Sequence, residues 1–239
     1  MMRIGIAQLQ VGLNCHENTA KVIEILDTVQ TNDWIAFPEG ALTGYAPQKK
    51  DYLSDLNPKI VSDCIERVAA RVRAKAGTCL VGTALYQKSK WFNAGITIGP
   101  NGEKAVYRKR ALSAIDRSCF TPGHHALFRT LSDVPFGILI CREIVVPSLW
   151  TTLKSRGARV VFHLNNALKR EDHIWRHLLI ARAVENGIFV CSINARGPAY
   201  GLGSFVISPR GDVLLHIPSD EERVSWTEMD LSQVVDDFS

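Results

Sequence analysis

Three polar side chains of types that take part in nucleophilic catalysis stand beside apolar segments of the chain. Glu39 follows the apolar run 34–37 by two residues, and Cys141 ends the apolar run 137–140. Lys109 lies at the start of a stretch without hydrophobic periodicity. Functional sites of α/β proteins gather at the carboxyl ends of strands, where loops converge on a rigid sheet. We therefore treat these three residues as one candidate site.

The three residue types divide the tasks of a cysteine-dependent reaction between them. A thiol is a strong nucleophile only as the thiolate, so an attacking Cys141 needs a base to take its proton or a cation to lower its pKa. A carboxylate kept from water has a raised pKa and can act as that base, and an ammonium stabilises the anion that forms when a carbonyl is attacked. Each residue also has an ordinary explanation: a cysteine at a strand end is usually structural, and Glu39 and Lys109 could be surface charges.

The elements that must position these residues alternate between short apolar runs and longer amphipathic stretches. The pattern predicts strands at 4–7, 34–37, 78–87, 91–99, 136–141, 160–164, 188–194, 203–208 and 212–216, helices at 22–29, 60–72, 147–156 and 172–187, and a long irregular loop at 108–125. No Ser-, Gly- or Pro-rich linker separates the two halves. We therefore expect residues 1–239 to form a single α/β domain, with two sheets flanked by helices.

Composition excludes several other classes of protein. The chain has 239 residues, of which 46% are hydrophobic and 22% charged, as in ordinary folded proteins. No apolar run reaches about 18 residues, so a membrane-spanning helix is not expected. The net charge of +4 comes from basic residues that are scattered, apart from the clusters 108–110 and 169–170, which argues against nucleic-acid binding. The first residues lack the features of a secretory signal, so a cytoplasmic protein is expected.

The six cysteines indicate neither a zinc site nor a disulfide framework, because no CxxC pair is present. They stand at positions 15, 64, 79, 119, 141 and 191. In a reducing compartment such residues are mostly small buried hydrophobic side chains. Cys141 is the exception that the candidate site requires.

Three segments, in the order in which they occur, resemble signatures of the nitrilase superfamily, the carbon-nitrogen hydrolases. They are Phe-Pro-Glu-Gly at 37–40 with Thr-Gly-Tyr at 43–45, Tyr-Arg-Lys-Arg-Ala-Leu at 107–112, and Gly-Ile-Leu-Ile-Cys-Arg-Glu at 137–143. Weaker matches lie at 7–8, 93, 120–123, 181–186, 203–204 and 208–211. No single match is decisive, but three motifs in order at such separations are together specific.

The resemblance implies a four-layer αββα sandwich of the nitrilase type, with a Glu-Lys-Cys triad and neither a metal nor an organic cofactor. Glu39 matches the general base, Lys109 the cation that holds the tetrahedral oxyanion, and Cys141 the nucleophile. The backbone N–H of Arg142 would help to form the oxyanion hole. The implied reaction is hydrolysis of a small linear amide through a thioester, with release of ammonia.

Two departures from the family's pattern affect the expected substrate site. Many members carry a second Glu beyond the lysine, and Asp116 stands at the best match here, one methylene shorter. Its part in orienting substrate and Lys109 is therefore an open expectation. Arg142 stands where members often have an aromatic residue, and it could bind a substrate carboxylate or form an ion pair with Glu143 or another acid. For Glu143 we expect a structural role, either holding the loop or pairing with Arg142.

The remaining substrate-binding candidates are Asn166, which could equally form a turn, and Tyr45 of the first signature. His163, near the predicted site, is expected to be a core histidine. A nitrile or carbamoyl substrate, an acyltransferase, and a non-catalytic binding or scaffold protein of the same fold are the alternatives. The resemblance also implies a homodimer or higher homo-oligomer, with the helices predicted at 147–156 and 172–187 at the interface. Charge and composition predict no nucleic-acid or membrane partner.

Overall fold

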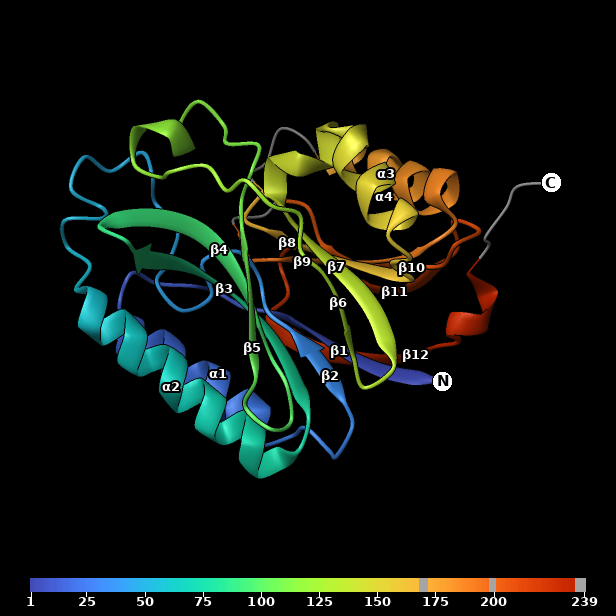
Figure 1. Ribbon diagram of the computed structural model, residues 1–239, viewed down its shortest axis with the longest axis horizontal. Helices are drawn as coiled ribbons and strands as arrows, with labels where there is room; N and C mark the ends of the chain where they lie inside the picture. Colours follow the sequence, from blue (N-terminus) through green and yellow to red (C-terminus); the bar gives the residue numbers. More distant parts are fainter. Residues whose placement is uncertain (168–171, 198–200, 235–239) are drawn as a thin grey trace.

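The computed structural model describes residues 1–167, 172–197 and 201–234 of the chain. Two sheets of six strands lie face to face, and a pair of helices covers the outer face of each sheet (Figure 1). These four layers confirm the αββα sandwich that the sequence predicts. The basic pair at 169–170 lies outside the described residues.

The first sheet contains three parallel strands at its centre and antiparallel strands at its edges. Its members are β1 (Met2–Gln8), β2 (Trp34–Ala36), β3 (Thr78–Gln87), β4 (Lys90–Ile98), β5 (Lys104–Arg108) and β12 (Arg223–Met229), in the order β12-β1-β2-β3-β4-β5. Strands β1, β2 and β3 are parallel, and each remaining neighbour is antiparallel. The helices α1 (Cys15–Leu26) and α2 (Pro58–Lys75) cover its outer face (Figure 1).

The second sheet repeats this arrangement with strands from the rest of the chain. Its members are β6 (Phe128–Leu131), β7 (Val134–Ile140), β8 (Val160–Asn165), β9 (Phe189–Asn194), β10 (Ser204–Ile207) and β11 (Val213–Ile217), in the order β11-β10-β9-β8-β7-β6. Strands β7, β8 and β9 are parallel. The helices α3 (Pro147–Ser155) and α4 (Asp172–Asn186) lie on the outer face. In each sheet the parallel strands supply the carboxyl ends at which a site can form.

Local sequence signals explain where the first two helices begin and end. The side chains of Asn14 and Asn57 cap α1 and α2, because each accepts hydrogen bonds from two backbone N–H groups of the first turn. Pro58 occupies the first turn of α2, where no intrahelical N–H is needed. That helix stops at Ala76, whose backbone is left-handed with φ of 51°.

Aromatic side chains fill the layer between the two sheets. The Trp34 ring of β2 stacks on Phe162 of β8 with 5.7 Å between ring centroids, and meets Phe136 of β7 edge-on at 5.4 Å. Close approach of the sheets also needs Gly95, since an added Cβ there would lie 3.0 Å from the Ile138 side chain. Each buried side chain of this size contributes about 1.5–3 kcal/mol. The sheets are therefore held at a fixed separation, which keeps the ends of their strands in register.

Every predicted strand and helix is present, most with small shifts at the ends, but the helix predicted at 22–29 begins already at Cys15. Three strands were not expected. These are β5, β6 and β12, of which β5 begins before the predicted irregular loop. All three are edge strands with partly exposed residues, so their sequences carry a weaker apolar pattern than the central strands. No helix in the described ranges is long and apolar enough to cross a membrane.

Four apolar side chains of the two helices predicted at the oligomer interface are buried within the chain. They are Leu149, Trp150, Trp175 and Leu179. Packing on the sheet therefore explains why these side chains are apolar. They give no support to the homo-oligomer, which stays a prediction.

Candidate active site

Glu39 lies just beyond β2, in a turn that passes over the neighbouring strand. Its side chain is fully buried, and Oε1 accepts a hydrogen bond of 2.6 Å from Asn93 Nδ2 of β4. The turn can lie this close to β3 because residue 82 is glycine. A Cβ there would stand 2.3 Å from the Pro38 carbonyl oxygen and 2.7 Å from Glu39 Cα. Backbone packing therefore fixes the carboxylate at the end of the sheet.

Lys109 directly follows β5 and is held by its backbone on both sides. Its N–H donates to the Asn93 carbonyl at 2.8 Å, and its own carbonyl accepts from Gly123 N–H at 2.8 Å. The buried ammonium lies 3.0 Å from Glu39 Oε1 and 2.9 Å from Asp116 Oδ2. Burial alone would lower the pKa of Lys109, but these negative charges outweigh it and the pKa is raised. The lysine is therefore a permanent cation in the site.

Cys141 follows β7 and opens a short 3-10 helix, Cys141–Val145. Its backbone is left-handed, with φ of 49°, which is a strained conformation for a residue with a side chain and is typical of functional turns. Unlike Glu39 and Lys109, it is partly exposed. Burial of the sulfur and the charge of Glu39 raise the pKa of Cys141, although Lys109 and the Asn166 backbone N–H oppose the rise. The resting group is a thiol that needs a base before it can attack.

Asp116 completes the charged cluster in spite of its short side chain. It is fully buried, and besides its contact with Lys109 its Oδ1 accepts a hydrogen bond of 2.7 Å from Tyr45. The N–H and Oγ of Ser113 each donate to Oδ2 at 3.0 Å. Burial would raise the pKa of Asp116, but Lys109 and these donors hold it below its ordinary value. Asp116 therefore reaches the lysine as a carboxylate, and the Tyr45 hydroxyl is engaged with it.

Glu143 joins the segment that carries the lysine to the segment that carries the cysteine. Its Oε1 accepts from the Tyr107 hydroxyl at 2.7 Å and from the backbone N–H groups of Arg110 and Ala111 at 2.7 and 3.0 Å. Its Oε2 accepts from Ile140 N–H at 2.7 Å. Burial raises the pKa of Glu143. This carboxylate therefore holds the loop, which is the first of the two structural roles expected for Glu143.

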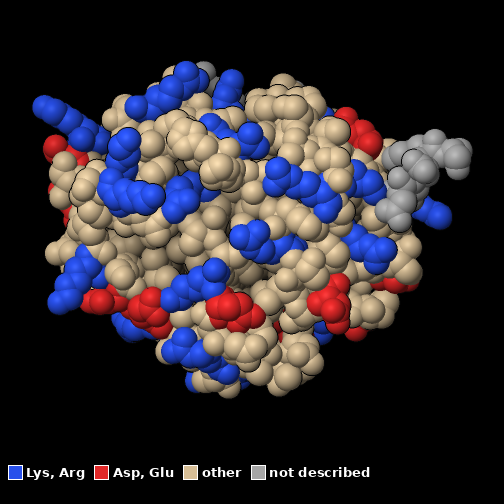
Figure 2. Space-filling view, in the orientation of Figure 1, with Lys and Arg blue, Asp and Glu red and all other residues tan. Residues whose placement is uncertain are grey.

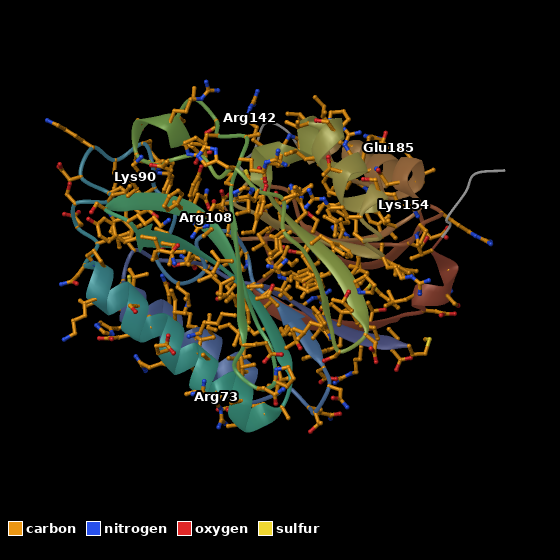
Figure 3. All side chains as sticks on the ribbon, viewed as in Figure 1. Arg73, Lys90, Arg108, Arg142, Lys154 and Glu185 are labelled. Carbon is orange, nitrogen blue, oxygen red and sulfur yellow. The ribbon has the colours of Figure 1, made fainter. Side chains whose placement is uncertain are left out.

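Arg142 is not the partner of Glu143. Its side chain is exposed, and Figure 3 shows it extending away from the ribbon into solvent. No ion pair of Arg142 is found in the part of the chain that the structure describes. The pairing of Arg142 with Glu143 is therefore wrong. The role of Arg142 in binding a substrate carboxylate stays a prediction.

A buried histidine holds the other side of the nucleophile's turn. His163 Nε2 lies 2.8 Å from the Cys141 carbonyl oxygen, and because a carbonyl can only accept, this nitrogen carries the proton. Nδ1 then accepts from Asn165 Nδ2 at 3.0 Å. Burial lowers the pKa of His163 to about 4, so the ring is neutral near pH 7. Together with Glu143, which holds Ile140, it fixes the backbone before and after the strained position.

Comparison with known proteins assigns the chain to a family. The family model described as carbon-nitrogen hydrolase matches residues 3–237. The chain belongs to the carbon-nitrogen hydrolase family. It is 28% identical over 240 residues to an (R)-stereoselective amidase from Pseudomonas sp., covering 98% of this chain and 86% of that protein. It is also 28% identical over 204 residues to a nitrilase from Pyrococcus abyssi, covering 82% and 76%.

Solved structures share the fold of this hydrolase. One is a mutant of the amidase from Nesterenkonia sp. AN1, which shows the result of Michael addition of acrylamide at that enzyme's active-site cysteine. It superposes with a TM-score of 0.85 and 21% identity, over 96% of this chain and 94% of that one. The likeness shows that the two proteins share the four-layer sandwich.

The neutral state of His163 gives the hydrolase a pH-dependent stability. A histidine with a pKa of 6.5 when unfolded and about 4 when folded binds a proton more readily in the unfolded state, so it stabilises the fold above pH 6.5. That stability is lost as the pH falls from 6.5 toward 4, by up to about 3 kcal/mol. Urea unfolding at pH 7.5, 6.0 and 5.0 measures the loss.

The His163→Gln variant of the hydrolase provides the control for this prediction. It should unfold more easily at pH 7.5 and then lose less stability than the parent as the pH falls. Glu143, whose raised pKa acts in the opposite direction, is present in both proteins and cancels in the comparison. Parallel pH profiles for the two proteins would show that His163 does not titrate in this way.

The other predicted substrate-binding residues of the hydrolase lie close to the cluster. Tyr45 is half-buried with its hydroxyl on Asp116, and the backbone N–H of Asn166 acts on the Cys141 sulfur. The Asn166 side chain is partly exposed. Substrate contacts by Asp116, Tyr45 and Asn166 stay predictions.

Sequence patterns gave no role in the site to three residues that support it. Asn93 of β4, Tyr107 of β5 and His163 of β8 are buried polar or amphipathic side chains inside otherwise apolar strands. That placement is the available signal, because a polar group inside a buried strand needs a partner. The partner itself, Glu39, Glu143 or the Cys141 carbonyl, comes from a distant part of the chain.

Proposed function

We propose that this hydrolase cleaves the C–N bond of a small linear amide through a thioester on Cys141. The observation that carries the proposal is the state of the Glu39 carboxylate. Its Oε1 is engaged by Asn93 and Lys109, whereas Oε2 is buried without a hydrogen-bond partner in the described chain. A buried acceptor without a partner is costly, and Oε2 is the oxygen left to take the thiol proton.

The reaction begins as Glu39 accepts the Cys141 proton and the sulfur attacks the carbonyl carbon of the amide. Negative charge develops on the carbonyl oxygen, where the Lys109 ammonium and the Arg142 backbone N–H stabilise it. Glu39 returns the proton to the amide nitrogen as the C–N bond breaks. Ammonia leaves and the acyl group stays on sulfur as a thioester.

Hydrolysis of the thioester uses the same carboxylate again. Glu39 takes a proton from water, and the hydroxyl attacks the acyl carbon to give a second oxyanion beside Lys109. As the C–S bond breaks, the Cys141 thiolate leaves and recovers its proton from Glu39. A carboxylic acid departs, and the site returns to its starting state.

An amide is the proposed substrate class because a relative that matches 98% of this chain over 86% of its own length is an amidase. A nitrile uses the same three residues, and a relative that is a nitrilase keeps it as the second candidate. Ammonia release from propionamide and from propionitrile at equal concentration separates the two, and we expect the amide to react faster. A faster nitrile would reverse the assignment.

Carbamoyl hydrolysis, acyl transfer to an amine and a scaffold role are the remaining alternatives. The charged cluster argues against the scaffold, since a buried Glu, Lys and Asp are costly to maintain without a use. A domain over 1–239, a cytoplasmic location and a homo-oligomer stay predictions alongside this function. Light scattering of the purified chain measures the last of these.

Glu39→Gln tests the general base. The amide keeps the size of the carboxylate but cannot accept the thiol proton, so turnover of propionamide should fall about 10²–10⁴-fold. Ammonia release is the measurement, and circular dichroism checks the fold. Glu24→Gln, an exposed glutamate of α1, is the matched control and should keep full activity. Unimpaired acylation of Cys141 in the Glu39→Gln variant would remove Glu39 from the role of base.

A further inference from the structure

A cavity of about 690 Å³, called the second cavity to distinguish it from the triad, has neither Glu39, Lys109 nor Cys141 in its lining. It lies between the turn that joins β3 to β4, the end of β5 and the loop at 121–127 that leads into β6. Its volume falls within the range of sites for small molecules, roughly 300–1,000 Å³.

Basic side chains surround the second cavity, and no acidic side chain lines it. They are Lys88, Lys90, Arg108, His124, His125 and Arg129. No described Asp or Glu forms an ion pair with any of them. Figure 2 shows Lys and Arg side chains over this part of the molecule, and Figure 3 places Lys90 and Arg108 there. Uncompensated positive charge around a hollow attracts anions.

Arg108 is the fixed member of this group. Its Nη2 donates to Gln87 Oε1, and its guanidinium lies over the Phe92 ring, 5.0 Å from the centroid. Its Nε is buried and has no hydrogen-bond partner in the described chain. An unsatisfied buried donor on a held guanidinium is unfavourable, and an anion bound to that guanidinium would offset this cost. Exposed lysines alone do not provide such a donor.

The charge and the lining together indicate the kind of anion. Lys88, Lys90, Arg108 and Arg129 carry four permanent positive charges, more than one carboxylate would balance. Apolar side chains, among them Phe92, Val106 and Leu127, form part of the wall. We propose that this second cavity binds a small phosphorylated molecule, with its phosphate on Arg108 and its apolar part on Phe92.

The second cavity shares its backbone with Lys109. Arg108 precedes the lysine, and successive side chains of a strand point to opposite faces. The loop that forms the far wall donates from Gly123 N–H to the Lys109 carbonyl. A ligand there would therefore contact the outside of the segment that holds Lys109, whatever reaction Cys141 performs.

Calorimetric titration of the whole chain with phenyl phosphate tests the proposal. We expect saturable binding, weakened at least about tenfold by Arg108→Gln, because a hydrogen bond between charged groups is lost. Arg73→Gln removes the same charge from an exposed position on α2 and should leave binding unchanged (Figure 3). The double variant Lys90→Gln and Arg129→Gln, which changes only exposed side chains, should also weaken binding.

Other outcomes would overturn the proposal. Absence of binding, or equal weakening by Arg108→Gln and Arg73→Gln, would show that only net charge attracts the anion. Inorganic phosphate binding as tightly as phenyl phosphate would contradict the part assigned to Phe92. Benzoate binding as tightly would contradict the preference for phosphate. If Arg108→Gln does not fold, the double variant Lys90→Gln and Arg129→Gln is used in its place. Binding that this double variant leaves unchanged would then contradict the proposal.

Discussion

Replacing Cys141 by alanine should abolish amide turnover, with a loss of about 10⁶-fold, the size seen when a catalytic nucleophile is removed. The reason is that neither Glu39 nor Lys109 can supply the atom that bonds to the acyl carbon. Steady-state ammonia release from propionamide measures the effect. Cys141→Ser should recover little activity, because a hydroxyl is far harder to ionise than a thiol.

Cys119 offers a matched control for the nucleophile. It is the other cysteine of the six that is not fully buried, and its pKa is raised by burial. It lacks the left-handed backbone of Cys141, and its thiol donates to the Asp116 backbone carbonyl. Cys119→Ala should therefore keep nearly full activity. Turnover retained by Cys141→Ala, or lost in Cys119→Ala, would contradict the assignment of the nucleophile.

Replacing Lys109 by alanine should reduce both activity and stability. Loss of the cation beside the oxyanion costs about 3–4 kcal/mol of transition-state stabilisation, or roughly 10²–10³-fold in turnover. It also leaves the buried carboxylates of Glu39 and Asp116 without the ammonium that lies 3.0 and 2.9 Å from them. Breaking a buried ion pair in this way costs about 3–5 kcal/mol.

Two measurements separate the effects of Lys109→Ala. Urea unfolding at pH 7.5 reports the stability, with Lys59→Ala on the exposed face of α2 as the control. Adding Asp116→Asn removes one of the stranded charges and should recover part of the stability but none of the activity. A loss of stability below about 1 kcal/mol would show that the charged cluster is not a coupled unit, and unchanged turnover would remove Lys109 from the mechanism.

The strand ends were the most predictable part of the molecule. Apolar runs before Glu39 and Cys141 indicated two buried strands, and the structure places both residues just beyond β2 and β7. The signal is local, because it depends only on the alternation of apolar runs and polar ends. Periodicity predicts the strands but not which strand ends lie together. The order of the three family-like segments supplied that second expectation.

Contacts between distant segments could not be predicted in the same way. The alternatives for Glu143 were distinguishable only once Tyr107 of β5 and Arg110, two residues beyond the end of that strand, were placed beside it. His163 lies in an apolar run typical of a core strand, and no residue near it in the sequence indicates a hydrogen bond to the Cys141 carbonyl. Similarly, β12 pairs with β1 from the far end of the chain. Such pairings depend on tertiary packing rather than on local propensity.

Mass spectrometry of the acid-quenched enzyme during turnover of propionamide tests the central claim most directly. The account predicts one propionyl group on the peptide that contains Cys141, present during turnover and lost when the amide is consumed. The Cys141→Ala variant should show no acyl group on any peptide. Steady release of ammonia with Cys141 unmodified at every quench time, or with the acyl group on Cys119, would contradict the account.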